Sequence, residues 1–188
     1  MNIPEFIIYT GPMFGSKTTR LLATIDRYRY QNKRIVAFKP AIDDRYDSSS
    51  IVTHSGGKLS AVCVAEGEDV LQYIRDMPTR PDVVAVDEAF MIDGISDSLI
   101  KIFRMGITIA VSSLDLSAKF NVFEEIEKMS CWATRVEKCP AVCPVCGSDA
   151  YYTFKKVGGE EEILVGGSDI YEPRCWNHHP HFSRKQNA

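Results

Sequence analysis

The sequence has no apolar run close to the roughly 18 residues that a membrane-spanning helix requires. Its first residues, MNIPEFIIYTGPMF, carry neither the basic start nor the long apolar core of a secretory signal. Internal repeats and low-complexity tracts are also missing. These absences predict a cytoplasmic protein with no membrane partner.

An excess of positive charge is missing too. The 188 residues include 22 Lys and Arg against 25 Asp and Glu, which gives a net charge of -3 and a pI of about 5.8. Without an overall positive field, binding to nucleic acid would need a local basic patch. We therefore expect no nucleic acid among the partners.

Disulfides are not expected, because the six cysteines occur without a secretory signal. Four of them fall between residues 139 and 175, close to clustered histidines, and this crowding indicates metal ligands. The other two, Cys63 and Cys131, are expected to be buried and to behave as small apolar residues.

The order of the apolar segments predicts one α/β domain with a small appendage, which suits a chain of this length. Up to about residue 130, short apolar runs typical of strands alternate with amphipathic segments typical of helices, and this favours a mainly parallel sheet. The predicted strands are 5–10, 34–38, 82–86 and the run from 107, and the predicted helices are 18–31, 67–76 and 94–104. Residues 51–64 indicate a hairpin that turns at Gly56 and Gly57.

The segment GPMFGSKTT, residues 11–19, joins the first predicted strand to the first predicted helix. A phosphate-binding loop has a glycine, four further residues and then Gly-Lys-Ser/Thr in this position. Gly11, Lys17 and Thr18 fit that pattern, and the amides at the start of the helix would bind phosphates. The alternative is a strand-to-helix turn that binds no ligand.

Ser16 departs from the pattern, because a glycine usually precedes the lysine. A serine costs about 1–2 kcal/mol if that position is left-handed. We therefore expect the preceding Gly15 to adopt the unusual backbone angle instead.

Two acidic residues, Asp87 and Glu88, follow the buried apolar run that ends at residue 86. Ligands of open α/β sheets bind at the carboxyl ends of the strands. Asp87 there can hold Mg²⁺ or its waters, and Glu88 can accept a proton from a hydroxyl or water that attacks a phosphate. Taken alone, such a pair can equally cap a helix.

Two chelating pairs lie near the C-terminus, Cys143-Pro-Val-Cys146 and Cys175-Trp-Asn-His178, with 28 residues between them. Three cysteines and one histidine match a closed, structural zinc site. A metal would stabilise this module, which is too poor in apolar residues to bury a core of its own. The alternative to a metal site is a set of unliganded thiols, and the alternative ligands are Cys139, His179 and His181.

With GPMF…KTT, KPAIDDRY, VDEAF, CPVC and GGSDIY, the sequence resembles the thymidine kinases of the cytosolic, zinc-containing type. The motifs occur in the order and spacing of that family from about residue 5 to 178. The resemblance implies a RecA-like phosphate-loop fold and transfer of the ATP γ-phosphate to the 5′-hydroxyl of thymidine, with deoxyuridine as a second acceptor. It further implies Mg²⁺, structural Zn²⁺, a homotetramer and feedback by a deoxynucleoside triphosphate.

The resemblance also assigns roles by motif. Glu88 would be the general base, and Lys17 and Arg45 would stabilise charge on the transferred phosphate. The residues expected to bind ATP and Mg²⁺ are Gly11, Pro12, Met13, Phe14, Gly15, Ser16, Lys17, Thr18, Asp43 and Asp87. The residues expected to bind the nucleoside are Met91, Phe90, Phe120, Gly167 and Tyr171, with Tyr171 over one face of the base. Without the resemblance, residues 43–45 indicate a solvated turn and Tyr171 an ordinary, partly buried aromatic residue.

Three departures from the family pattern fall on the nucleoside side. Phe90 replaces a glutamine, Met91 replaces an aromatic residue, and Ala118 stands where a phenylalanine is usual. Methionine can still cover a ring face with its polarizable sulfur. The changes therefore concern the choice of base more than the phosphoryl transfer.

Two other functions remain as alternatives, a zinc-ribbon ATPase that depends on nucleic acid and a nucleotide-binding homologue that has lost catalysis. Residues 139–188 carry five Lys or Arg against six Asp or Glu, which argues against the first alternative. Retention of Lys17 and Glu88 argues against the second. We expect an ATP-binding domain at 1–138, a zinc module with a lasso loop over the nucleoside at 139–180, and a flexible tail at 181–188.

Overall fold

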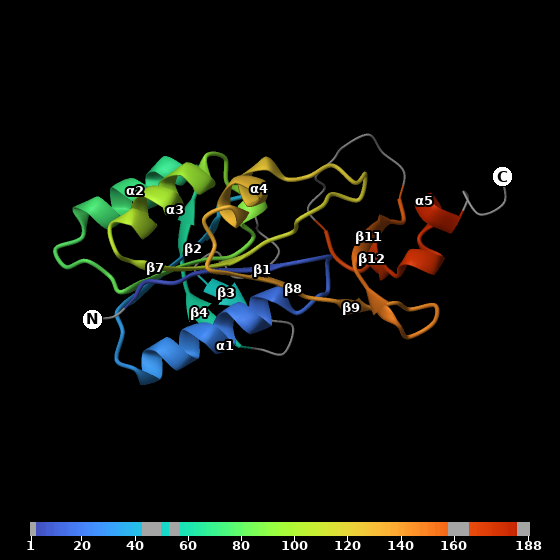
Figure 1. The fold of residues 1–188 in the computed structure, drawn as a ribbon, viewed down its shortest axis with the longest axis horizontal. Coiled ribbons are helices and arrows are strands. Elements are labelled where there is room, and N and C mark those ends of the chain that lie inside the picture. The colour runs from blue at the N-terminus through green and yellow to red at the C-terminus, as the bar shows by residue number, and fades with distance from the viewer. Residues whose placement is uncertain (1–2, 43–49, 53–56, 158–165, 184–188) are drawn as a thin grey trace.

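The computed structural model describes residues 3–42, 50–52, 57–157 and 166–183. Its central element is a six-stranded sheet with the order β5-β2-β6-β7-β1-β8, in which all neighbouring strands are parallel (Figure 1). In chain order the strands are β1 (Phe6–Thr10), β2 (Ile35–Pro40), β5 (Val62–Val64), β6 (Val83–Val86), β7 (Thr108–Ser112) and β8 (Arg135–Lys138). The parallel sheet confirms the predicted α/β class.

Helices cover both faces of this sheet (Figure 1). The first, α1 (Lys17–Tyr30), lies on one face, and α2 (Gly67–Asp76), α3 (Ile95–Arg104) and α4 (Glu124–Ser130) lie on the other. Successive strand residues point to opposite faces, so that Ile7 joins the core under α1 and Ile8 joins the core under α2 and α3. Burial on both faces explains why these strands are continuous apolar runs.

The three helices that the sequence predicts are present, each within one or two residues of its expected bounds. Helix α4 and strand β8 extend this part of the chain beyond the segments that the apolar pattern predicts. In the part of the chain that the structure describes, no helix combines the length and the apolarity that crossing a membrane requires.

The hairpin predicted over residues 51–64 forms only in part. β3 (Ser50–Val52) and β4 (Lys58–Ser60) pair antiparallel, but β5 adds to the edge of the main sheet beside β2. The reason is packing, because Leu59 contacts the core under α1 whereas Val64 belongs to the core under α2. Of the predicted turn, Gly56 lies outside the described residues.

Over the described residues 139–157 and 166–183, the C-terminal part forms two small antiparallel pairs and two short helices. These are β9 (Ala141–Val142) with β10 (Asp149–Ala150), β11 (Tyr152–Lys155) with β12 (Tyr171–Arg174), the 3₁₀ helix η2 (Trp176–His178) and α5 (Pro180–Ser183). Helix α5 occupies residues where a flexible tail was predicted from 181. It is held there because Phe182 stacks on Trp176, with ring centroids 3.8 Å apart.

The predicted burial of Cys63 and Cys131 is wrong, since both side chains are exposed. Cys63 alternates with the inward-facing Val64 on the edge strand β5, and Cys131 follows the last residue of α4.

Candidate functional site

The loop between β1 and α1 contains three residues with positive φ, Gly11 (130°), Phe14 (65°) and Ser16 (57°). The expectation that Gly15 adopts the left-handed angle is wrong, because Ser16 adopts it itself. Gly15 serves a different purpose. A Cβ atom placed there would lie 2.6 Å from the carbonyl oxygen of Cys139, so the close approach of these backbones requires a glycine.

The side chain of Lys17 is buried, with 8% of its surface exposed, and lies back over its own loop. Its amine donates a hydrogen bond to the carbonyl oxygen of Pro12 at 2.6 Å. Burial lowers the pKa of this amine, and the nearby carboxylates of Glu88 and Asp87 oppose that shift. The loop therefore places one cation beside two carboxylates at the start of α1.

Asp87 follows β6 and is buried against the first turn of α1. The hydroxyl of Thr18 donates to its carboxylate oxygens at 3.1 and 3.3 Å, and the hydroxyl of Ser112 donates to the same carboxylate. Burial and the neighbouring Glu88 raise the pKa of Asp87 to about 7, although both hydroxyls act in the opposite direction. The structure thus brings together Thr18 and Asp87, which are distant in sequence.

Glu88 has φ 51° and ψ 44°, a left-handed conformation that is unusual for a residue with a side chain, and it precedes the 3₁₀ helix η1 (Ala89–Met91). The backbone is fixed on both sides of it. The amide of Asp87 donates to the carbonyl of Phe38 at 3.0 Å, and the amide of Phe90 donates to the hydroxyl of Ser113 at 3.1 Å. An observed strain of this kind favours a functional role for the residue.

Sequence reasoning missed Ser112 and Ser113. Ser112 is the last residue of β7, the strand beside β6, and Ser113 follows it, with Val86 opposite Val111. Neighbouring parallel strands end at the same edge of the sheet. The signal that could have found Ser112 and Ser113 was therefore their position directly after the apolar run that begins at residue 107.

The residues expected to bind the nucleoside lie in three places. Phe90 contacts Phe123, with ring centroids 4.7 Å apart. Phe120 packs against residues of the C-terminal part, namely Tyr152, His179, His181 and Phe182. Tyr171 is buried in β12, and Met91 and Gly167 are half-buried. Asp43 and Arg45 lie outside the described residues.

The four predicted metal ligands come together. The Sγ atoms of Cys143, Cys146 and Cys175 and a ring nitrogen of His178 all lie within 4.8 Å of one another. Three of the separations are 3.7 Å between Cys146 and Cys175, 4.0 Å between Cys143 and His178, and 3.2 Å between Cys175 and His178. Bonds of about 2.0–2.3 Å to a central zinc ion give a tetrahedron with edges of about 3.3–3.8 Å, so these residues fit that ion.

Local backbone structure explains why each pair can chelate. Gly147 has φ 74° and donates its amide to the carbonyl of Cys143 at 2.9 Å, which folds the first pair into a turn. In the second pair the amide of His178 donates to the carbonyl of Cys175 at 3.2 Å within η2.

The alternative ligands lie outside this cluster. Cys139 is buried beside the phosphate loop, and its thiol donates to the carbonyl of Glu137 at 3.5 Å. A ring nitrogen of His179 lies 3.4 Å from the carbonyl oxygen of Thr153, and His181 contacts the ring of Phe120.

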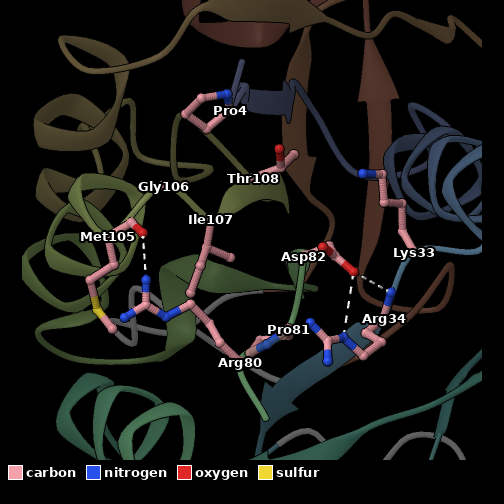
Figure 2. Close-up of a pocket in the computed structure, with 10 residues that line it drawn as sticks. All are labelled: Pro4, Lys33, Arg34, Arg80, Pro81, Asp82, Met105, Gly106, Ile107 and Thr108. Carbon is pink, nitrogen blue, oxygen red and sulfur yellow. Dashed lines mark hydrogen bonds and ion pairs between the residues drawn. The ribbon is translucent and has the colours of Figure 1, made fainter. Parts of the chain in front are cut away.

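Figure 2 shows a surface pocket elsewhere on the protein, whose lining includes Arg34, Arg80, Asp82 and Thr108. Several of these residues precede or begin β2, β6 and β7. The pocket therefore lies at the amino ends of these strands, whereas the phosphate loop follows the carboxyl end of β1. Its arginines are engaged within the pocket, Arg34 with Asp82 at 3.6 Å and Arg80 with the carbonyl of Met105 at 3.0 Å (Figure 2).

Comparison with known proteins agrees with the motifs. The family model described as Thymidine kinase matches residues 5–179. A thymidine kinase from Pyrobaculum aerophilum is 36% identical over 181 residues, covering 92% of this chain and 97% of that protein. Among solved structures, the genome packaging NTPase B204 from Sulfolobus turreted icosahedral virus 2, in complex with ATP-gammaS, matches with a TM-score of 0.41 and 13% identity over 69% of this chain and 72% of that one. The chain belongs to the thymidine kinase family, which makes it an ATP-dependent nucleoside kinase.

Proposed function

We propose that this protein transfers the γ-phosphate of ATP to the 5′-hydroxyl of thymidine, and that deoxyuridine is a second acceptor. The observation that carries the proposal is the group formed by Lys17, Thr18, Asp87 and Glu88 at the carboxyl ends of β1 and β6. A cation, a hydroxyl and two carboxylates are the groups that phosphoryl transfer from a nucleotide requires.

Each residue has a chemical role in this proposal. The amides at the start of α1 and the amine of Lys17 bind the phosphates of ATP and stabilise the charge that develops on the transferred group. Thr18 and Asp87 would hold Mg²⁺, directly or through its waters, and when bound this ion neutralises phosphate charge. Asp43 is proposed to help bind ATP and Mg²⁺, and Arg45 to stabilise charge on the transferred phosphate.

Glu88 accepts the proton of the 5′-hydroxyl as that oxygen attacks the γ-phosphorus. A new phosphorus-oxygen bond forms, and the bond to the oxygen that bridges the β and γ phosphates breaks. ADP leaves with that electron pair, and the nucleoside becomes its 5′-monophosphate. This role is supported by the half-buried position of Glu88 next to Asp87, just after the carboxyl end of β6.

The nucleoside is proposed to lie between η1 and the C-terminal module, where Tyr171 covers one face of the base. The other proposed contacts are Phe90, Met91, Phe120 and Gly167. The four clustered ligands are proposed to bind one structural zinc ion, because a Cys₃His set closes the coordination sphere and leaves no position for a substrate. The module at 139–180 would then be stabilised by its metal.

Phosphoryl transfer from labelled ATP with Mg²⁺ tests the proposal. Thymidine, deoxyuridine, deoxycytidine and deoxyadenosine are offered in turn, beside a reaction without nucleoside and one with single-stranded DNA. We expect labelled thymidine monophosphate as the main product. Absence of transfer to every nucleoside, or release of phosphate stimulated by DNA, would contradict the proposal.

The substitution Glu88→Gln tests the assignment of Glu88 as the general base. This variant should bind ATP normally and turn over on the order of 10²-fold more slowly, which is the scale of general-base catalysis. Glu68→Gln, which changes an exposed glutamate on α2, is the matched control and should keep full activity. Unchanged turnover of Glu88→Gln would show that Glu88 is not the general base.

A further inference from the structure

The phosphate loop contacts the C-terminal module directly, across 140 positions of sequence. The amide of Met13 donates a hydrogen bond of 3.1 Å to the side-chain hydroxyl of Thr153 in β11. Thr153 is buried, with 6% of its surface exposed, so the bond is partly shielded from water. The next residue of that strand, Phe154, and the ring of His179 pack together behind it.

The neighbouring loop residue makes a second contact of a different kind. Phe14 packs against a small apolar cluster formed by Ala141, Cys143, Ala150 and Cys175. Two of these four residues belong to the metal-ligand group. The side chain of Phe14 therefore packs beside the metal-ligand group of the module.

A third contact comes from the chain between the sheet and the module. The amide of Cys139 donates to the carbonyl of Thr10 at 2.7 Å, and its carbonyl oxygen packs against the backbone of both Gly11 and Gly15. Residues 139–153 thus contact the loop at Gly11, Met13, Phe14 and Gly15.

We propose that the C-terminal module positions the phosphate loop for ATP, and that Thr153 and Phe14 are the positioning residues through which it acts. The reason lies in the conformation of the loop. Phe14 and Ser16 are both left-handed at φ 65° and 57°, and residues with side chains keep such angles only where surrounding contacts impose them. For Phe14, the packing of its side chain on the module supplies one such contact.

This inference rests on the proposed function in one respect, namely that the loop binds the phosphates of ATP. It adds that the module acts on the ATP side of the reaction as well as on the nucleoside side. Weakening its contacts with the loop should therefore reduce affinity for ATP while leaving the turnover at saturating ATP unchanged.

The test is Thr153→Val, which removes the hydroxyl and keeps the shape of the side chain. Its matched control is Thr108→Val at the start of β7, where a threonine that is also 6% exposed accepts a hydrogen bond of 3.2 Å from the amide of Glu5. Thr108 lies in the pocket of Figure 2, at the opposite edge of the sheet. Titration calorimetry with ATP measures binding without a nucleoside, and thermal unfolding of both variants reports their stability.

We expect Thr153→Val to raise the Kd for ATP about three- to tenfold, the scale of one hydrogen bond, with a matching rise in KM for ATP and an unchanged kcat. Thr108→Val should leave both constants within twofold of the original protein. Equal effects of the two variants, or no effect of Thr153→Val, would overturn the inference.

Two further variants address Phe14. Phe14→Ala removes the contact with the module and should weaken ATP binding more than Phe14→Leu, which keeps most of the apolar volume. Equal affinities of these two would also overturn the inference. If the unmodified protein binds ATP but does not phosphorylate thymidine, the proposed function fails while the calorimetric comparison still decides this inference. If it does not bind ATP, both fail.

Discussion

The hydroxyl of Thr18 donates to both carboxylate oxygens of Asp87, at 3.1 and 3.3 Å, across 69 positions of sequence. The contact joins the first turn of α1 to the end of β6. A hydroxyl and a carboxylate at this separation can share one divalent cation or its waters. The geometry on which the proposed Mg²⁺ site depends is therefore set by one strand end and one helix start.

Replacing Asp87 by Asn should weaken the binding of Mg²⁺ at this site. The amide oxygen can still accept from Thr18, but the negative charge that attracts Mg²⁺ is lost. We expect the Mg²⁺ concentration for half-maximal activity to rise on the order of 10- to 100-fold, the usual effect of losing a group that supports a metal. Activity measured across a Mg²⁺ titration checks this.

Asp115 offers a control for the Asp87 prediction, because its carboxylate pairs with Lys138, the last residue of β8, at 2.8 Å. Asp115→Asn should leave the Mg²⁺ requirement within a few-fold of the original. A flat response to Asp87→Asn, with normal activity at low Mg²⁺, would contradict the role given to Asp87.

Much of the fold follows from periodicity in the sequence, because a parallel sheet buries its strands on both faces. The segments 6–9, 83–86 and 109–111 are apolar without interruption, and each lies in a central strand. Edge elements are harder to predict. β5 has three residues and β8 is largely exposed, so neither carries the apolar pattern of a buried strand.

The site was predictable where a motif fixes spacing along the chain, as for the four metal ligands that come together. It was not predictable where the contact comes from a distant segment. Gly15 looked like the flexible position of the loop, yet its lack of a side chain is explained by the carbonyl of Cys139. Ser113 belongs to no motif, and its contact with Phe90 depends on strand order.

Ser16→Gly should stabilise the protein. Serine in the left-handed region costs about 1–2 kcal/mol, and glycine gives back about 0.5–1 kcal/mol through its greater freedom in the unfolded chain. We expect the free energy of unfolding to rise by about 0.5–1 kcal/mol, measured by urea denaturation.

Asn32, with φ 55° after α1, is the control for Ser16. Asparagine tolerates this conformation better than serine, so Asn32→Gly should gain less stability. The reverse order would show that the angle at Ser16 carries no strain. Gly15→Ser, by contrast, should abolish ATP binding, because the new side chain would overlap the carbonyl oxygens of Cys139 and Pro12.

Ser113→Ala should slow turnover without changing affinity for ATP. The substitution leaves the part-buried amide of Phe90 without its side-chain acceptor, and the loss of an acceptor costs a fully buried group about 1–3 kcal/mol. The turn that holds Glu88 in its left-handed conformation would then be less populated. We expect kcat to fall by about tenfold, the factor that 1.4 kcal/mol represents.

Kinetics and calorimetry together check the prediction for Ser113. Ser98→Ala, at a buried serine on α3, is the matched control and should preserve kcat. In a Glu88→Gln background, Ser113→Ala should cause no further loss, since the base through which it acts is already gone. Additive losses would mean that Ser113 affects something other than Glu88.

Removing one metal ligand should affect both the C-terminal module and the phosphate loop. Cys146→Ser takes away one of four converging ligands, and the binding free energy of a structural zinc ion contributes directly to folding. We expect the purified variant to lose its zinc, measured by plasma emission spectrometry, and to unfold at a lower temperature. Cys131→Ser, at an exposed cysteine whose thiol donates to the carbonyl of Glu127 at 3.7 Å, should change neither property.

The same variant should bind ATP more weakly than the original protein, by at least the three- to tenfold expected for the loss of one hydrogen bond. Phe14 rests on Cys143 and Cys175, so loosening the metal cluster removes the surface that holds the loop. Calorimetric titration of ATP into Cys146→Ser checks this. Full ATP affinity in a protein that has lost its zinc would show that the loop keeps its conformation without the module.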